Sequence, residues 1–275
     1  MAPTTENGWV AEEPRASPND EPNNRDELTS EEFGRTTRAV VVEMNRLTSQ
    51  PNDPPELKQV EIEVAVDRSG SSNRIAVAAI DPFQYPNIPV GGAPGTSYYI
   101  SPDGGDSWPA NLRGDLPGLA FYTQAFDPVV EYDRNGDLFF CAVGENEILE
   151  EERAIFLSRM PAGTDDFLDG ELVRSVGVGS NRELDKPWCT TGLTDEAVPR
   201  DIVYVTYVET NLVPNPDVSE ILFKFSTNAG ASFSPVTVVS DSSDPTWPQV
   251  AMGIDKTVNF VWADNDNLPC LLYTS

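Results

Sequence analysis

The chain has 275 residues and a formal net charge of −27, because 45 acidic residues stand against 18 basic ones. A nucleic-acid partner is excluded, since phosphate contacts require a basic surface, and no segment is long and apolar enough to span a membrane. The absence of histidine excludes Ser-His-Asp and Cys-His nucleophilic catalysis and histidine-ligated zinc within this chain.

Residues 1–56 differ in composition from the rest of the chain. Glu, Asp, Asn, Pro, Ser and Thr dominate this segment, and the proline-rich run 51–55 closes it. Such a composition buries too little apolar surface to fold, so the segment is predicted to be mostly disordered, with a short strand at 38–44. Its start lacks the basic and apolar regions of a secretory signal, so either the protein is intracellular or its original start lies elsewhere.

From residue 57 onward, short apolar strands recur at a regular spacing. Pairs of strands are joined by turns that carry Asp67, Asp133, Asp195 and Asp255, so the steps are 66, 62 and 60 residues. A period of this size, with four short antiparallel strands in each repeat, predicts an all-β fold of propeller blades. The predicted blades are 57–113, 125–170, 183–239 and 245–275.

Residues 101–108, Ser-Pro-Asp-Gly-Gly-Asp-Ser-Trp, predict a hairpin turn. Ser101 ends a strand, and Asp103 can accept hydrogen bonds from the N–H groups of the turn itself. Gly105 supplies a backbone conformation that most residues avoid, and Trp108 folds back into the sheet. The role predicted for these residues is structural.

The same pattern recurs farther along the chain. Residues 226–233 keep the serine, the glycine and the aromatic residue and replace the aspartate by another turn-forming side chain: Ser226, Asn228, Gly230 and Phe233. A degenerate copy with a proline and an extra residue follows Ser158, and a fourth copy would begin at Ser275, where the sequence stops. We therefore expect a fragment that ends inside its fourth blade.

The pattern S-x-D-x-G-x-x-W in residues 101–108 resembles the Asp-box, or BNR repeat, of sialidases and related β-propellers. The resemblance implies a six-bladed propeller, of which 57–275 would cover about three and a half blades. It also favours an extracellular or cell-surface protein. In that family the boxes lie on the face away from the active site, which implies that the box residues hold the blades together.

Function is then expected on the opposite face, in the loops between second and third strands and in the connections between blades. The candidate binding residues there are Asp81, Asp185, Trp188, Asp244, Trp247 and Asp264. Asp127–Pro128, Asp185–Pro187 and Asp244–Pro245 recur at the same place in successive blades, which favours a structural turn.

The resemblance also implies a test for sialidase chemistry. Sialidases hold the substrate carboxylate with three arginines and use a tyrosine nucleophile, a glutamate that activates it and an aspartate acid/base. The Arg-Ile-Pro string that supplies the first arginine is missing, and 87–89, Asn-Ile-Pro, is the nearest match. Arg113 and Arg182 are candidates for a partial clamp, and Asp127 with Glu145 is the candidate acid/base pair of a glycoside hydrolase.

The leading interpretation is a module that binds carbohydrate or another protein without catalysis, because acidic and aromatic positions suit neutral sugars better than anionic ones. One alternative is the N-terminal part of an exo-α-sialidase or related glycoside hydrolase whose remaining catalytic residues lie past Ser275. Another is a purely structural propeller.

We expect no cofactor, with Ca²⁺ as the alternative. The runs 133–137 and 264–267 are rich in oxygen ligands but lack a complete calcium-binding loop, so they are more typical of plain turns. Of the three cysteines, Cys141, Cys189 and Cys270, an odd number argues against a full disulfide framework. We expect buried free thiols, with a Cys141–Cys189 bridge between neighbouring blades as the alternative.

Overall fold

The computed structural model describes residues 60–70, 72–81, 95–115, 122, 124–146, 152–177, 179–193, 201–213, 218–241, 244–264 and 271–274. The segment 1–56, Cys270 and Ser275 lie outside this part. Within it, the helical structure is one 3₁₀ turn, η1 (Ala110–Leu112), and no described helix has the length and hydropathy to cross a membrane.

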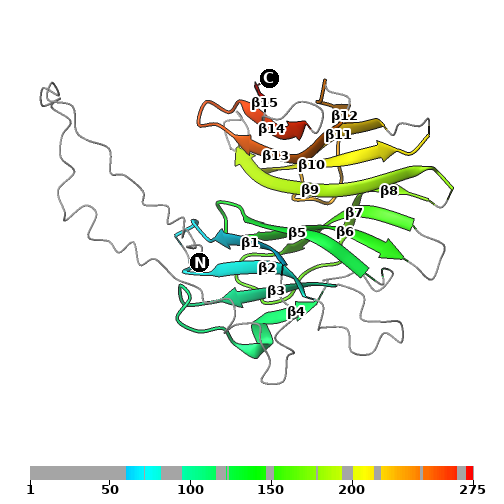
Figure 1. Ribbon diagram of the computed structural model, residues 1–275. Coiled ribbons are helices and arrows are strands. Elements are labelled where there is room, and N and C mark those ends of the chain that lie inside the picture. Colours follow the sequence, from blue (N-terminus) through cyan, green and yellow to red (C-terminus); the bar gives the residue numbers. More distant parts are fainter. Residues whose placement is uncertain are drawn as a thin grey trace, which may run out of the picture. The chain divides into compact units, whose positions relative to one another are not determined.

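The strands form four antiparallel sheets, each with its strands in chain order (Figure 1). The first sheet contains β1 (Val60–Val66), β2 (Ile75–Asp81), β3 (Gly95–Ser101) and β4 (Arg113–Asp115). The second contains β5 (Gln124–Tyr132), β6 (Leu138–Asn146), β7 (Glu152–Met160) and β8 (Glu171–Val176). The third contains β9 (Arg182–Leu193), β10 (Asp201–Asn211), β11 (Val218–Ser226) and β12 (Thr237–Val238), and the fourth β13 (Pro245–Met252), β14 (Val258–Asp264) and β15 (Leu271–Thr274).

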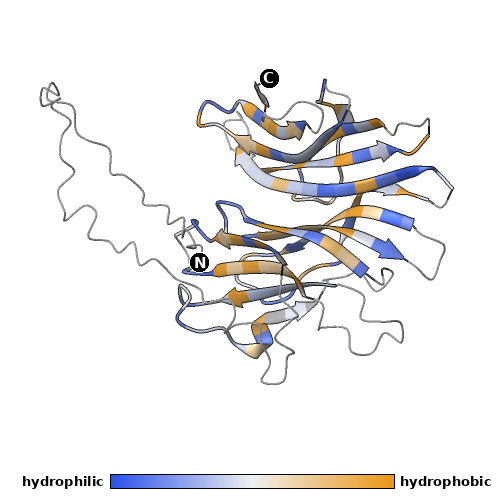
Figure 2. Cartoon of the chain, in the orientation of Figure 1, coloured by the Kyte–Doolittle hydropathy of each residue, from blue (hydrophilic) through white to orange (hydrophobic). Residues whose placement is uncertain are grey.

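The second strand of the second sheet, β6, forms because its apolar residues run without interruption after the turn. The sequence of β6 is Leu-Phe-Phe-Cys-Ala-Val, and all six residues are buried. An uninterrupted apolar run predicts a strand that is covered on both faces. Figure 2 shows hydrophilic residues mixed with hydrophobic ones along the first strands β5 and β9.

Neighbouring sheets pack face to face, and successive residues of one strand enter different cores. Phe140 belongs to the core between the first and second sheets, whereas Phe139 belongs to the core between the second and third. In the same way, Val205 faces the second sheet and Tyr204 faces the fourth. The first strands contact one another in the order β1, β5, β9 and β13. The predicted all-β blade architecture is confirmed.

The turns at 101–108 and 226–233 have the same hydrogen bonds. Ser101 Oγ accepts a bond from Gly105 N at 2.8 Å, and Asp103 Oδ1 accepts one from Ser107 N at 2.8 Å. In the second turn, Gly230 N donates to Ser226 Oγ at 2.9 Å, and Ser232 N donates to Asn228 Oδ1 at 3.0 Å. An asparagine therefore replaces the aspartate without loss of the turn.

The turn after Ser158 has a different geometry. β7 continues to Met160, and the chain then turns through a bond from Thr164 N to Pro161 O at 3.0 Å. Asp137 Oδ1 accepts a bond from Ala162 N at 2.7 Å, so the preceding hairpin supports this turn. The carbonyl of Pro161 and the carboxylate of Asp137 therefore both stabilise this turn.

Cys141 and Cys189 are buried and free. They lie in the core between the second and third sheets, and their thiols are hydrogen-bonded to each other. This bond and burial raise the pKa of Cys189 well above its usual value. The expectation of free thiols is confirmed for this pair.

Candidate binding site at the starts of the first strands

The two ends of each sheet carry different features. The first and third strands run in the same direction, because each is antiparallel to the second strand between them. The turn at 101–108 follows the end of β3, and its Asp103 forms a bridge with Asn73 in the turn after β1. The starts of β1, β5, β9 and β13 therefore lie at the end of the sheets opposite the two serine-centred turns.

Near its start, each first strand has a residue in the left-handed backbone region. The φ angles are 53° at Glu61, 51° at Asp127, 46° at Lys186 and 53° at Trp247. The pairing with the second strand shifts at each of these residues, which is the signature of a β-bulge. Such conformations are costly for residues other than glycine and cluster at functional sites.

In the fourth sheet, Trp247–Pro248 occupies the position that Asp127–Pro128 has in the second. β13 begins at Pro245 in regular pairing and bulges only after Thr246. The third sheet has Lys186–Pro187 at this position. The prediction that Asp244–Pro245 is equivalent to Asp127–Pro128 is therefore wrong. Pro245 and Pro248 lie close together in the sequence, and only the strand pairing shows which of them follows the bulge.

Lys186 connects the bulges of all four sheets. Its Nζ lies 2.8 Å from Asp127 Oδ1 and 3.2 Å from Glu61 Oε1. The same Nζ stands 4.3 Å from the centre of the Trp247 ring, a cation–π distance. The backbone N–H of Lys186 also donates to Asp127 Oδ2 at 3.2 Å. One ammonium group thus holds one residue from each of the other first strands.

The carboxyl groups around Lys186 differ in proton affinity. The hydrogen bond with Asp127, followed by burial, raises the pKa of Glu61 to about 7. Burial and then the hydrogen bond with Asp127 raise the pKa of Asp185 to about 6. For Asp127 itself, burial opposes ionisation, but hydrogen bonds from Glu61, Asp185 and Lys186 outweigh it and lower the pKa. Near neutral pH, Asp127 is ionised and Glu61 holds a proton part of the time.

A cavity of about 240 Å³, here named the inner cavity, opens at these bulges. Trp247 is 57% exposed, and Trp188 is half-buried at the same cavity. The described residues that line it are Glu61, Glu63, Asp127, Pro128, Val129, Lys186, Pro187, Trp188, Trp247, Pro248 and Gln249. Aromatic and proline surfaces with a few convergent polar groups are typical of a small-ligand site.

A second cavity of about 610 Å³, here named the outer cavity, lies between the second and third sheets. Arg153 is ion-paired with Glu145, and Arg182 with Glu209. Glu209 is 6% exposed and also accepts a bond from Arg174 Nε at 2.9 Å. The described lining residues are Glu145, Asn146, Arg153, Gly177, Gly179, Ser180, Asn181, Arg182, Glu183 and Leu212.

The structure does not bring Asp127 and Glu145 together as an acid/base pair. Asp127 lines the inner cavity and binds Lys186, whereas Glu145 lines the outer cavity and binds Arg153. Each carboxylate therefore has its own cation and lines its own cavity. Asp127 and Glu145 do not form the acid/base pair predicted for a glycoside hydrolase.

The other predicted residues are distributed unevenly. Trp188 and Trp247 both line the inner cavity, and Arg182 lines the outer one. Asp264 is buried at the end of β14, and Asp244 is half-buried just before β13; neither lines either cavity. Asp81 ends β2 and Arg113 begins β4, and the side chains of these two residues are outside the description.

Sequence reasoning missed Glu61, Glu63 and Lys186 as site residues. Glu61 follows the polar N-terminal segment and precedes no proline, so nothing local marks it as equivalent to Asp127. The run Asp185–Pro187 marks Lys186 only as part of a turn. A usable signal was available, because Lys186 is one of only four lysines in a chain with 45 acidic residues.

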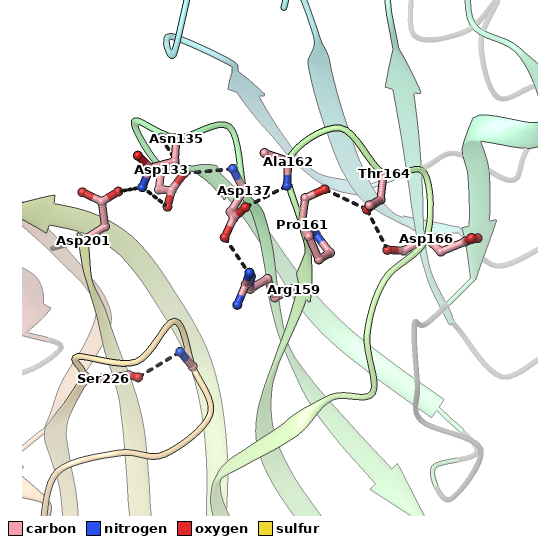
Figure 3. A network of polar contacts seen from close by, with 11 residues as sticks. Asp133, Asn135, Asp137, Arg159, Pro161, Ala162, Thr164, Asp166, Asp201 and Ser226 are labelled. Atoms are coloured by element: carbon pink, nitrogen blue, oxygen red, sulfur yellow. Dashed lines mark hydrogen bonds and ion pairs between the residues drawn. The ribbon is translucent and has the colours of Figure 1, made fainter. Parts of the chain in front are cut away.

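The oxygen-rich run 133–137 is a tight turn (Figure 3). Asp133 Oδ1 accepts bonds from the N–H groups of Asn135 and Asp137 at 2.8 and 2.9 Å. Asp137 Oδ2 lies 2.7 Å from Arg159 Nε, and Asn135 bonds to Asp201 of the next sheet. These carboxylates stabilise the backbone at the same end as the serine-centred turns, away from both cavities.

No protein-family model and no curated protein matches the chain. Solved structures do resemble it. A protein of unknown function from Dyadobacter fermentans has a TM-score of 0.53 and 13% identity, covering 78% of this chain and 58% of that one. A Hadza microbial sialidase has a TM-score of 0.51 and 12% identity, covering 79% and 44%. An α-L-arabinofuranosidase of Fusarium graminearum has a TM-score of 0.50 and 12% identity, covering 80% and 63%.

At these identities the likeness concerns the fold. The chain has a β-propeller fold, as its four face-packed antiparallel sheets indicated, and it shares this fold with these proteins. It spans less than two thirds of the length of each of these three proteins.

Proposed function

We propose that the chain is a carbohydrate-binding module of the sialidase-like propeller type and that the inner cavity takes a neutral sugar. The observation that carries the proposal is Trp247, a large aromatic side chain that is 57% exposed at the rim of a cavity with convergent carboxylates. A sugar ring can lie on the indole face of Trp247 that the Lys186 ammonium does not cover, while its hydroxyl groups bond to polar groups of the same cavity.

The charge of the site favours a neutral ligand. Glu61, Asp127 and Asp185 surround a single ammonium group, Glu63 also lines the cavity, and the whole chain carries −27. Such a field repels the carboxylate of an acidic sugar. The described lining of the inner cavity includes no arginine, and an arginine clamp is what bidentate recognition of a carboxylate requires.

The serine-centred turns support the same class. We propose that residues 101–108 and 226–233 are Asp-boxes with a structural role, because both turns use their side chains to satisfy their own backbone. This leaves the opposite end of the sheets for ligands. By the same resemblance we propose an extracellular or cell-surface location.

Glycoside hydrolysis is the second candidate, and the divergence of the Glu61 and Asp127 pKa values favours it. Two carboxyl groups whose pKa values move apart are the usual arrangement of an acid and a base. However, glycosidase carboxylates are separated by roughly 5 to 9.5 Å, whereas Glu61 and Asp127 are directly hydrogen-bonded. Binding without hydrolysis therefore fits this pair better.

The test is calorimetric titration of the full chain with neutral monosaccharides and with sialic acid. We expect binding of at least one neutral sugar, and a Trp247→Ala variant should weaken it about tenfold, since loss of a stacking surface is worth about 1.4 kcal/mol. Ile254→Ala is the matched control, because Ile254 is fully exposed in the turn at the other end of the same sheet. Absence of neutral-sugar binding would favour a protein-binding or structural role, and release of a reducing sugar would favour the hydrolase.

A further inference from the structure

The two cavities share one strand. Arg182 and Glu183 of β9 line the outer cavity, whereas Lys186, Pro187 and Trp188 of the same strand line the inner cavity. Both cavities open at the starts of the first strands. Lys186 lies four residue steps along β9 from Arg182, a span of about 13 Å. A ligand that follows β9 between the cavities must therefore be longer than a single sugar ring.

The outer cavity presents hydrogen-bond donors next to acceptors. Arg153 is paired with Glu145, and Arg153 NH1 lies 3.8 Å from Glu183 Oε2. Arg182 is paired with Glu209. Because each guanidinium already has a carboxylate partner, the site has little unbalanced positive charge for an anion. A hydroxyl group both donates and accepts, so polyhydroxylated neutral ligands match these pairs.

The connection between β8 and β9 leaves the outer cavity open. A side-chain carbon added at Gly177 or Gly179 would meet no atom within 4 Å. Gly177 is not in the left-handed backbone region, unlike Gly179, whose φ is 72°. Ser180 N donates to Gly177 O at 3.1 Å, and Leu212 N donates to Asn181 O at 2.8 Å, so the backbone groups of Gly177 and Asn181 are hydrogen-bonded. Gly177, which lines the outer cavity, is therefore a position where a side chain can be introduced to narrow that cavity.

We infer that the inner and outer cavities form one extended site for a neutral oligosaccharide, with one ring on Trp247 and the hydroxyl-rich end between Arg153 and Arg182. The inference rests on the proposed sugar-binding function and adds its size specificity. The aromatic cavity supplies a stacking surface, and the polar cavity supplies paired donors and acceptors along β9.

The experiment is calorimetric titration of the full chain with monosaccharide to tetrasaccharide members of neutral series, β-1,4-linked glucose and α-1,5-linked arabinose. Affinity should rise by at least about tenfold from the shortest to the longest member of the series that binds. In Gly177→Leu the long members should fall to the affinity of the monosaccharide, while monosaccharide binding stays unchanged. Gly177→Ala is the graded control, and Trp247→Ala should weaken all members alike.

A second variant protects the test against misfolding of Gly177→Leu. Arg153→Met combined with Glu145→Met removes one donor–acceptor pair without changing the net charge, and it should weaken only the long members. Affinity that does not depend on chain length, or equal losses for short and long members in both variants, would overturn the extended site. If the unsubstituted chain binds no neutral sugar of any length, the proposed function itself fails.

Discussion

The ammonium of Lys186 binds Asp127 Oδ1 at 2.8 Å and so joins the first strands of the second and third sheets. Because the same group reaches Glu61 and Trp247, one side chain ties together the left-handed bulges of four sheets. Burial lowers the pKa of Lys186, but the hydrogen bond to Asp127 and the nearby carboxylates outweigh it and raise the pKa. The lysine stays charged, and the site depends on it.

Replacing Lys186 by methionine should destabilise the folded chain. The substitution keeps most of the apolar stem but leaves Asp127, which is 9% exposed, without its cation. Removing one partner of a buried ion pair costs about 3–5 kcal/mol, and partial exposure of Lys186 reduces this to about 2 kcal/mol. Urea unfolding followed by circular dichroism measures the change. Lys256→Met, at an exposed position in the β13–β14 turn, should change the midpoint little; equal losses in both variants would contradict this account.

The stability of the chain should fall as the pH rises from about 4.5 to about 7, because Glu61 binds its proton more tightly when folded. The pKa of Glu61 in the folded chain, about 7, lies above the ordinary value of 4.5. Its contribution to the free energy of unfolding is therefore complete below about pH 4.5 and is lost as the pH passes about 7. Asp185, whose pKa is raised to about 6, changes the stability in the same direction. Glu61→Gln should reduce the decline of the urea midpoint over this range.

Glu131 provides the check on that measurement. Burial raises its pKa to about 7 as well, so Glu131→Gln should also reduce the decline. The two effects should add, because additivity holds for groups without shared partners. If the urea midpoint of Glu61→Gln changes with pH in parallel with that of the unsubstituted chain, the pKa of Glu61 does not change on folding.

The serine of the 101–108 turn should matter more than its aspartate. Ser101 is fully buried, and its Oγ accepts the bond from Gly105 N, so Ser101→Ala leaves a half-buried N–H without this partner and should cost about 1 kcal/mol. Asp103→Asn should be nearly neutral, since Asn228 already makes the equivalent bond in the second turn. Thermal unfolding compares the two variants, and the reverse order of their midpoints would refute the assignment.

Cys141 and Cys189 should be unreactive toward a thiol reagent while the chain is folded. Both are buried, and the raised pKa of Cys189 keeps its thiol protonated. A Cys270→Ser background removes the third cysteine from the assay. We expect two thiols to titrate in urea and none before unfolding. Rapid labelling in native buffer would mean that the core between the second and third sheets opens.

Local chemistry made much of the fold predictable. The turns at 101–108 and 226–233 could be assigned because serine, aspartate or asparagine, and glycine act on their own neighbouring backbone. The strand β6 was evident from its uninterrupted apolar run, which needs no knowledge of its partners. The candidate site was less predictable, since its residues come from four separate strands.

Sequence by itself determined the class of fold, the two serine-centred turns, and the exclusion of histidine-dependent chemistry, because these depend on composition and on contacts within a few residues. Only the tertiary structure decided that Trp247–Pro248 takes the place of Asp244–Pro245, that Glu61 meets Lys186, and that Asp127 and Glu145 lie in different cavities. The physical reason is that a β-bulge shifts a strand by one residue against its partner, and only the pairing between strands determines which side chains then converge.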